Sequence, residues 1–461
     1  MTTTEFECYV RKGLGRAVTL LQNESDKTPF YETIMRIIER QPGYTHISAQ
    51  YLYELIRASG SHELEDAAVE RAGELYMTPV GYSMNGYKLL FTFYGDGNQT
   101  AGEKLKDIYQ DLFSELSVRT ELPDRKNDKA SIFMFLSSFI ALITDKEWLR
   151  RIFRDMGALF ERQNMFHEAS FYDFFINTRY KLKKSFDNTL TAMSEESPQV
   201  KRFADRMYEI DAERLRQIAN PSPHRVDTDK LVEEVCTYII SGDGSRPAKF
   251  YENFNLFSSE QQRRIARLAE GIHDPARLNR VVSLFTSNVA VWPLDPAPLI
   301  TLAWEYMGYL GSSKLDTDEK RLAKNSIYAL GNFRTDEVRS LAFALIERGY
   351  LTEASALWAK NYKAGDREQF VEMFKKMCLE DWRKVPYYAT LDLLKQDFDG
   401  IPIELFETIY EYGGNCFVRE VALEGMHSRG LLTDAIIEEC RHDNDYEVRE
   451  YIDYLTKGSQ H

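Results

Sequence analysis

The sequence repeats one short pattern in its last third, as DEVRSLA at 336–342, FVREVAL at 417–423 and DNDYEVRE at 443–450. Each copy contains a Val-Arg pair beside apolar residues that recur every three or four positions, as they do in an amphipathic helix. One helical hairpin cannot bury its apolar face alone, so hairpins of this kind stack and share a core. The pattern therefore predicts stacked helices over this part of the chain.

The same spacing of apolar residues occurs in the rest of the chain, for example at 33–40 and 228–240. Only 14 Pro and 25 Gly occur in 461 residues, and they fall mainly between the periodic segments. We therefore predict an all-α protein with short connections. The exception is 76–94, where Asn85-Gly86 separates two aromatic-rich runs. That segment is compatible with a small β-hairpin or with a helix.

The Val-Arg pattern, with ALGN at 329–332 before its first copy, resembles HEAT-type repeats over 324–455. The resemblance implies an elongated, right-handed α-solenoid of roughly ten helical hairpins. It also implies that the valines are buried and that each arginine reaches an aspartate of an adjacent turn. The residues assigned to this structural repeat ladder are Asp336, Arg339, Arg419, Asp445 and Arg449.

A second resemblance covers one tetratricopeptide-like hairpin, in which Phe153, Gly157, Phe160, Phe166 and Ala169 occupy the large and small positions. It implies a helix, a tight turn and a second helix, with small residues where the two helices approach each other.

Two polar breaks that contain prolines, at 121–128 and 220–224, interrupt the helical pattern. Closely spaced prolines prevent a helix from continuing. We therefore expect three regions: an irregular helical region at 1–120, a middle region at 129–219 with the tetratricopeptide-like hairpin, and a HEAT-like region at 226–461.

Charge and cysteine content argue against several functions. The chain has 58 Lys and Arg against 72 Asp and Glu, a net charge of −14, which repels nucleic-acid backbones. Its five cysteines are scattered and never form C-x-x-C, which favours reduced thiols over disulfides or a zinc site. No motif for nucleophilic, acid–base or phosphate chemistry is present. We expect no metal, no cofactor and no catalytic activity.

The longest apolar run, at 132–143, is shorter than the roughly 20 residues that a membrane span needs. The first residues, MTTTEFECYVRKG, lack the apolar core of a secretory signal. We therefore expect a cytoplasmic protein without a membrane contact. Its oligomeric state is left open.

One segment, YDFFINTRYKLKK at 172–184, combines aromatic rings with basic side chains. This combination suits an acidic peptide or a single nucleic-acid strand, which would bind by stacking and charge. The residues predicted to bind a partner are Tyr172, Arg179, Tyr180, Lys183 and Lys184. The alternative interpretation is an aromatic core on one helix face and solvated lysines on the other.

The predicted function is a non-enzymatic scaffold or adaptor that holds a protein or acidic peptide in a groove of the solenoid. One alternative is a HEAT-like nucleic-acid-binding protein, similar to the DNA alkylation glycosylases, which would need a basic concave face. Another is a regulatory subunit of a larger complex. The distribution of basic side chains separates the first alternative from the scaffold.

Overall fold

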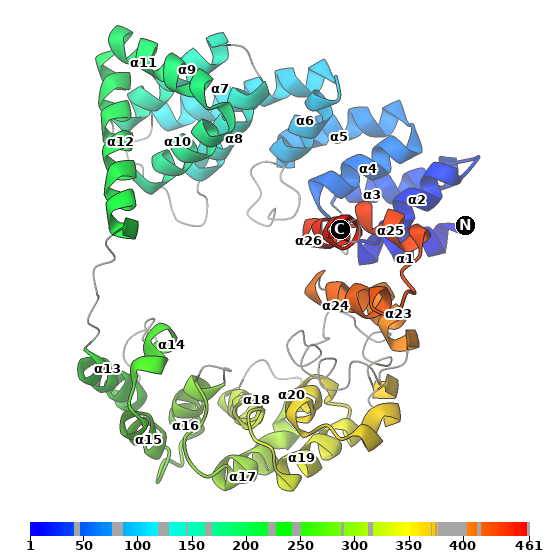
Figure 1. The fold of residues 1–461 in the computed structure, drawn as a ribbon, viewed down its shortest axis with the longest axis vertical. Coiled ribbons are helices and arrows are strands. Elements are labelled where there is room, and N and C mark those ends of the chain that lie inside the picture. Colours follow the sequence, from blue (N-terminus) through cyan, green and yellow to red (C-terminus); the bar gives the residue numbers. More distant parts are fainter. Residues whose placement is uncertain are drawn as a thin grey trace. The chain divides into compact units, whose positions relative to one another are not determined.

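The computed structural model describes most of the chain. The described residues are 1–40, 47–75, 86–118, 129–143, 146–161, 168–219, 227–241, 250–286, 290–311, 317–369, 371–373, 376, 403–412 and 416–458. Every regular element within these ranges is a helix, and they contain no strand. The predicted all-α class is therefore confirmed, as Figure 1 shows.

The helices form two compact units. Unit 1 contains Met1–Pro223 and Asp434–Asp453, and unit 2 contains His224–Thr433 and Tyr454–His461. The first boundary falls within the proline-bearing break at 220–224. In sequence, unit 2 is thus inserted between two segments of unit 1. The division into regions 1–120, 129–219 and 226–461 stays a prediction.

Unit 1 is built from helices in which sequence neighbours pack together, such as α6 with α7 and α11 with α12. A continuous cluster of buried apolar side chains extends through it from Phe6 to Met207. Its α-helices are α1 (Thr3–Lys12), α2 (Arg16–Asn23), α3 (Tyr31–Ile38), α4 (Ala49–Ser59), α5 (His62–Leu75), α6 (Gly86–Gly95), α7 (Gln99–Val118), α8 (Lys129–Ile143), α9 (Lys146–Phe160), α10 (Glu168–Leu182), α11 (Lys184–Glu196), α12 (Pro198–Ala219), α25 (Asp434–Arg441) and α26 (Tyr446–Gly458), the last of these up to Asp453.

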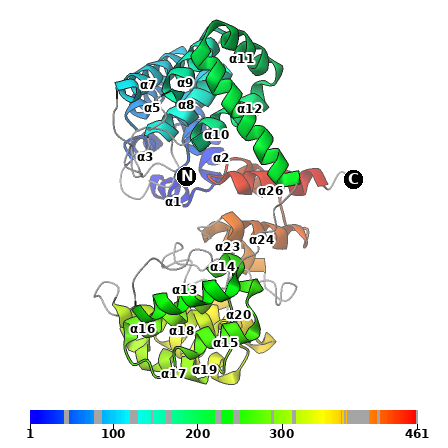
Figure 2. The same ribbon diagram turned by 90° about the vertical axis from the view of Figure 1, so that its left-hand side faces the viewer.

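Unit 2 also pairs sequence neighbours, and Figure 2 shows its helices from a second direction. Helix α17 packs on α18, α19 on α20 and α23 on α24, while α18 also contacts α16 and α20. This packing is consistent with a helical repeat fold. The described α-helices are α13 (Thr228–Ser241), α14 (Phe250–Asn253), α15 (Ser259–Arg267), α16 (Pro275–Val282), α17 (Ala297–Tyr306), α18 (Asp318–Leu330), α19 (Asp336–Glu347), α20 (Leu351–Asn361), α23 (Ile403–Tyr412) and α24 (Cys416–His427).

The small β-hairpin considered for 76–94 is wrong, because residues 86–95 form helix α6. Tyr87, Leu90 and Phe93 are buried and follow one another at three-residue intervals, so they share one helix face. That spacing suits a buried helix and not the two-residue alternation of a strand. Residues 76–85 lie outside the described residues.

The two helices predicted from the tetratricopeptide resemblance exist as α9 and α10, but their main partners are other helices. Helix α9 packs on α11 and α12, and α10 packs on α8. A Cβ on Gly157 would lie 2.9 Å from the Val200 nitrogen, so this small residue admits the backbone of α12. The predicted turn at Asn164 and the position of Phe166 lie outside the described residues.

The start and the end of unit 1 meet at two glycines that follow α1. Gly13 has a φ of +71°, and a Cβ there would lie 2.7 Å from the Asn444 Cβ. A Cβ on Gly15 would overlap the Glu439 carbonyl group. The Asn444 N–H donates to the Gly13 carbonyl at 2.9 Å. The glycines thus allow the backbone between α25 and α26 to lie directly against the turn between α1 and α2.

Polar side chains complete this contact. The Asn444 carboxamide oxygen accepts from the Ser48 N–H at 2.7 Å, and Arg16 pairs with Glu439 at 2.9 Å. Glu54 of α4 lies 2.8 Å from His442 Nδ1 and 3.3 Å from Arg449 Nη1. These contacts hold α25 and α26 on α2 and α4, although about 400 residues separate them in sequence.

The Val-Arg copy at 443–450 therefore belongs to unit 1. Val448 has no exposed surface, as the HEAT resemblance implies. The side chain of Arg449 reaches Glu54, while the Arg449 N–H bonds the Asp445 carbonyl within the helix. The carboxylate that meets this arginine thus comes from the N-terminal helices and not from an adjacent repeat.

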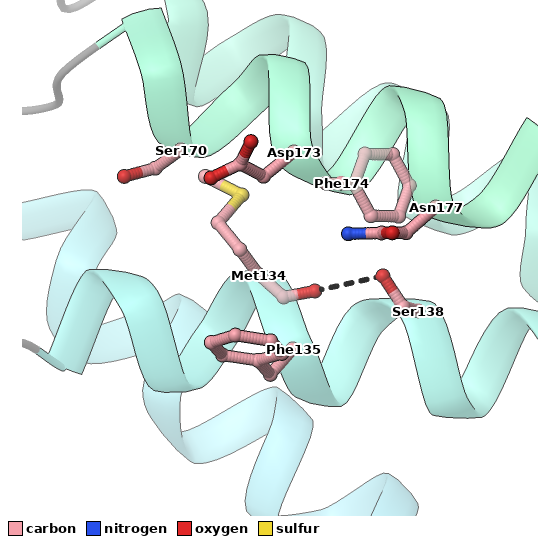
Figure 3. Close-up of a pocket in the computed structure, with 7 residues that line it drawn as sticks. All are labelled: Met134, Phe135, Ser138, Ser170, Asp173, Phe174 and Asn177. Carbon is pink, nitrogen blue, oxygen red and sulfur yellow. Dashed lines mark hydrogen bonds between the residues drawn. The ribbon is translucent and has the colours of Figure 1, made fainter.

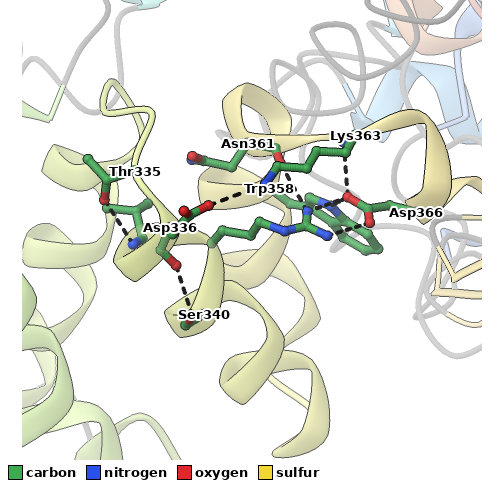
Figure 4. A network of polar contacts seen from close by, with 9 residues as sticks. Thr335, Asp336, Ser340, Trp358, Asn361, Lys363 and Asp366 are labelled. Atoms are coloured by element: carbon green, nitrogen blue, oxygen red, sulfur yellow. Dashed lines mark hydrogen bonds and ion pairs between the residues drawn. The ribbon is translucent and has the colours of Figure 1, made fainter.

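In unit 2, Arg339 forms an ion pair with Asp366, in the short 3₁₀ turn Ala364–Asp366 after α20. Figure 4 shows Trp358, Asn361 and Lys363 around this aspartate. Asp366 also accepts from the Trp358 indole N–H at 3.1 Å and the Lys363 N–H at 3.0 Å. Burial raises the pKa of Asp366, but these hydrogen bonds and Arg339 outweigh burial and hold the pKa below its usual value. An arginine thus meets an aspartate of a neighbouring turn.

The other ladder residues differ in their surroundings. Asp336 is exposed and pairs with Lys363 at 3.2 Å, not with Arg339. Val338 is fully buried, and Arg419 is only 2% exposed.

In the described parts of the chain, no helix is both long and apolar enough to cross a membrane.

Replacing Asp366 by Ala should lower the free energy of unfolding by about 3 kcal/mol, because it leaves Arg339 and the Trp358 N–H without their main acceptor. The matched substitution Asp336→Ala should cost no more than an ordinary surface change, because that carboxylate is solvated. Denaturant unfolding of the full chain, followed by tryptophan fluorescence, measures both. Equal losses for the two variants would contradict the assignment of Asp366 as the partner of Arg339.

The contact between His442 and Glu54 should weaken as the pH rises. The hydrogen bond to Glu54 raises the pKa of His442 above 6.5, and Glu438 adds to this against the opposing effect of burial. The stabilisation is therefore complete below about pH 6.5 and is lost as the pH rises through the raised pKa. Hydrogen exchange of α25 amides, corrected for intrinsic rates, should show a larger loss of protection in His442→Gln at about pH 6 than at about pH 8.5. Exposed His273→Gln is the control, and a pH-independent difference would contradict the prediction.

Candidate interaction surface on helix α10

Helix α10 carries most of the residues predicted to bind a partner. Its core face consists of Phe171, Phe174, Phe175 and Thr178. The helix ends where the Lys183 N–H donates to the Arg179 carbonyl at 2.8 Å. Lys183 has a φ of +50°, and α11 begins at the next residue. The chain turns sharply there, which separates Lys183 and Lys184 from the core face.

Tyr172 is buried and is used inside unit 1. Its hydroxyl donates to Asp211 of α12 at 2.9 Å, and the Arg214 guanidinium lies 4.2 Å from the centre of its ring. Burial, followed by the hydrogen bond to Asp211, raises the pKa of Tyr172. The ring therefore helps to join α10 to α12 and leaves little surface for stacking on a partner.

Arg179 joins three helices. Its Nε donates to Asp187 of α11 at 2.9 Å, and its Nη1 lies 3.4 Å from Asp211 of α12. The guanidinium also lies 5.1 Å from the centre of the Tyr208 ring, and the Tyr208 hydroxyl donates to Asp187 at 3.1 Å. Two carboxylates and an aromatic ring thus surround this charge, which reduces its attraction for an external anion.

Three of the predicted residues remain on the surface. Tyr180 is 79% exposed, and Lys183 and Lys184 are exposed beside it in sequence. Neither lysine forms an ion pair with any described residue. We call Tyr180, Lys183 and Lys184 the basic corner. The structure therefore divides the predicted site into two structural residues and three residues that face solvent.

A pocket lies between α10 and α8, and Figure 3 shows its residues as sticks. Its volume is about 40 Å³. Helix α10 contributes Ser170, Asp173, Phe174 and Asn177, and α8 contributes Met134, Phe135 and Ser138. We call this the α8–α10 pocket. It is below the size of most small-molecule sites, which occupy roughly 300–1,000 Å³.

The two walls of the pocket are joined by hydroxyl groups. The Thr178 hydroxyl donates to Ser138 Oγ at 3.1 Å, and Ser138 donates to the Met134 carbonyl at 3.2 Å. Asp173 is exposed at the rim and forms no hydrogen bond or ion pair with the rest of the described chain. Phe135 is 53% exposed, which is unusual for so large an apolar ring.

A perturbed carboxylate elsewhere in unit 1 has a structural explanation. Burial raises the pKa of Asp155, against the hydrogen bond from the Tyr109 hydroxyl at 2.8 Å. The centre of the Tyr109 ring lies 4.9 Å from that of Phe133 and 5.9 Å from that of Trp148. The hydrogen bond therefore joins α7 to α9 within an aromatic cluster. Among the described residues, no group of three His, Cys, Asp or Glu side chains is placed to hold a metal ion.

Sequence reasoning missed the partners of Arg179 because they are distant in the chain, 8 residues away for Asp187 and 32 for Asp211. The polar residues that α10 contributes to the pocket can be recognised from their spacing in the sequence. Ser170, Asp173 and Asn177 recur at three- and four-residue spacing along an otherwise aromatic helix. That spacing places them on one face, but only the packing of α8 against it creates a pocket.

Comparisons with known proteins do not assign a family. No family model and no curated protein match the sequence. Two solved structures align over most of the chain at 11% identity. An engineered protein covers 97% of this chain and 99% of its own with a TM-score of 0.18. The structure of SYS-1 covers 96% and 83% with a TM-score of 0.20. Scores this low mean that the backbones do not superimpose, so neither structure informs the function.

Arg179→Glu should destabilise unit 1, because it places a third carboxylate beside Asp187 and Asp211. Solvent screening reduces the effect at this partly exposed position, so we expect a loss of about 1 kcal/mol, or about 2–4 °C in melting temperature. Lys183→Glu should leave the melting temperature unchanged. Thermal unfolding of both variants by circular dichroism tests this, and an unchanged melting temperature for Arg179→Glu would show that the network is not structural.

Proposed function

We propose that this protein is a non-enzymatic helical repeat scaffold, of the HEAT-like, right-handed solenoid type, that binds an acidic segment of a protein partner. The observation that carries the proposal is the basic corner. It combines an exposed aromatic ring with two lysines that pair with no described residue, in a chain whose net charge is −14. An exposed tyrosine offers a large, rigid contact area, and such rings are enriched at the centres of protein interfaces.

The electrostatics around the basic corner support a small, local contact. Most arginines of the neighbouring helices are matched by carboxylates: Arg206 pairs with Glu168 at 2.9 Å, Arg150 with Glu196, and Arg202 with Glu161. A phosphate backbone would have to compete with each of these carboxylates for its cation. A nucleic acid is therefore the less favoured partner, since it needs many uncompensated cations in a row.

The proposal fits an adaptor and also a regulatory subunit, because both bind through a surface and leave the chemistry to another protein. In either case the two lysines act mainly on the encounter with the acidic partner. Charge at the edge of an interface accelerates association and makes it sensitive to salt, while aromatic contacts determine how long the complex lasts.

Reversing both corner lysines, in Lys183→Glu with Lys184→Glu, should abolish capture of the acidic partner from the native cell extract. A matched control reverses two exposed charges of unit 2, in Lys230→Glu with Arg263→Glu, and should retain the partner. Once the partner is identified, its association rate at low salt should fall about tenfold in the corner variant and lose most of its salt dependence. Equal capture by the corner variant and the control would contradict the proposed site.

A further inference from the structure

The α8–α10 pocket has a chemistry opposite to that of the basic corner. Its floor is apolar, formed by Met134 and Phe174, which are 4% and 2% exposed. Its rim carries the Asp173 carboxylate, which has no partner among the described residues, and the exposed Phe135 ring. An apolar floor below an unpaired carboxylate and an aromatic face is complementary to a cation on an apolar stem.

We propose that the α8–α10 pocket receives an arginine side chain of a protein partner, with the guanidinium bound to Asp173 and stacked on Phe135. The inference rests on the proposed function in one respect, that the guest belongs to a protein partner. It adds a second contact on the same helix, with the opposite charge. A partner that combines acidic residues with an arginine would use both contacts.

The other possible guests fit less well. A purely apolar side chain would remove water from Asp173 without replacing its hydrogen bonds, which costs free energy. A metal ion requires several ligands, whereas Asp173 is the only carboxylate among the described residues that line the pocket. The volume of about 40 Å³ suits the end of one side chain and is too small for a cofactor.

The arrangement of acceptors distinguishes arginine from lysine. Ser170, Asp173 and Asn177 lie along one face of α10, as Figure 3 shows, and each carries an oxygen that can accept a hydrogen bond. A guanidinium presents five N–H donors in a plane and can stack on an aromatic ring while it bonds to several acceptors. An ammonium is a compact, strongly hydrated charge and gains less from such a line of acceptors.

The test uses the full chain with ¹³C-labelled methionine methyl groups, since Met134 lies in the pocket. The probe is the peptide acetyl-Gly-Arg-Gly-amide. Its isosteric control contains citrulline, which keeps the shape of arginine and removes the charge. The Met134 methyl signal, assigned by its loss in Met134→Leu, should shift saturably with the arginine peptide. The citrulline peptide should bind at least about tenfold more weakly, because it loses a charge-assisted hydrogen bond.

Two variants of the pocket and one control variant make the test specific. Asp173→Asn should weaken binding of the arginine peptide about tenfold, to the level of the citrulline peptide. Asp111→Asn, which neutralises an exposed aspartate on α7, should leave binding unchanged. Phe135→Ala should weaken binding several-fold, because the guanidinium loses its stacking surface. The ring is exposed, so its removal should not disturb the fold.

A Met134 signal that does not move, or that moves equally with the citrulline peptide, would overturn the proposal. Equal affinity of wild type and Asp173→Asn would do the same, as would tighter binding of the matching lysine peptide. The titration needs no native partner. Its failure would therefore leave the basic corner standing, and failure of the lysine reversals would leave the pocket standing.

Discussion

The backbone at residues 439–444 lies so close to Gly13 and Gly15 that no side chain fits between them. This approach brings Asp434–Asp453 into one unit with Met1–Pro223, although His224–Thr433 separates them in sequence. The ion pair of Arg16 with Glu439 and the contacts of Glu54 with His442 and Arg449 surround this backbone approach. The side-chain pairs thus specify the register of the contact, while the two glycines make the contact sterically feasible.

In both units, arginine–aspartate pairs join neighbouring helices and turns. In unit 2, Asp366 gathers the Arg339 guanidinium and the Trp358 and Lys363 N–H groups at one turn. In unit 1, Arg179 joins three helices through Asp187 and Asp211. Breaking such partly buried pairs is costly because a charge is left without its partner. The acidic chain therefore uses much of its arginine content to position its own helices.

The surfaces proposed to bind a partner are small and local. The basic corner offers Tyr180 with two lysines, and the α8–α10 pocket offers one carboxylate above an apolar floor. Tyr180 and one wall of the pocket lie on α10, whose inner face is fixed by Phe171, Phe174 and Phe175, and the two lysines lie at the turn into α11. Opposite charges, one along α10 and one at the turn that follows it, can select a partner by its charge pattern as well as by contact area.

The sequence by itself determined the helical class, since apolar residues at three- and four-residue spacing and sparse Pro and Gly allow few other structures. The resemblance of the Val-Arg pattern to HEAT-type repeats also implied the burial of Val338 and Val448, both of which have no exposed surface. The sequence could not decide between hairpin and helix at 76–94, where the runs are short and aromatic, and the structure shows a helix from residue 86. Only the tertiary structure decided which groups meet. Arg339 pairs with Asp366, Arg449 with Glu54 and Arg179 with Asp211. Helix α8 forms the second wall of the pocket on α10. Local spacing determines which face a residue occupies, but the partner across that face depends on which helices pack together, and no local pattern encodes that choice.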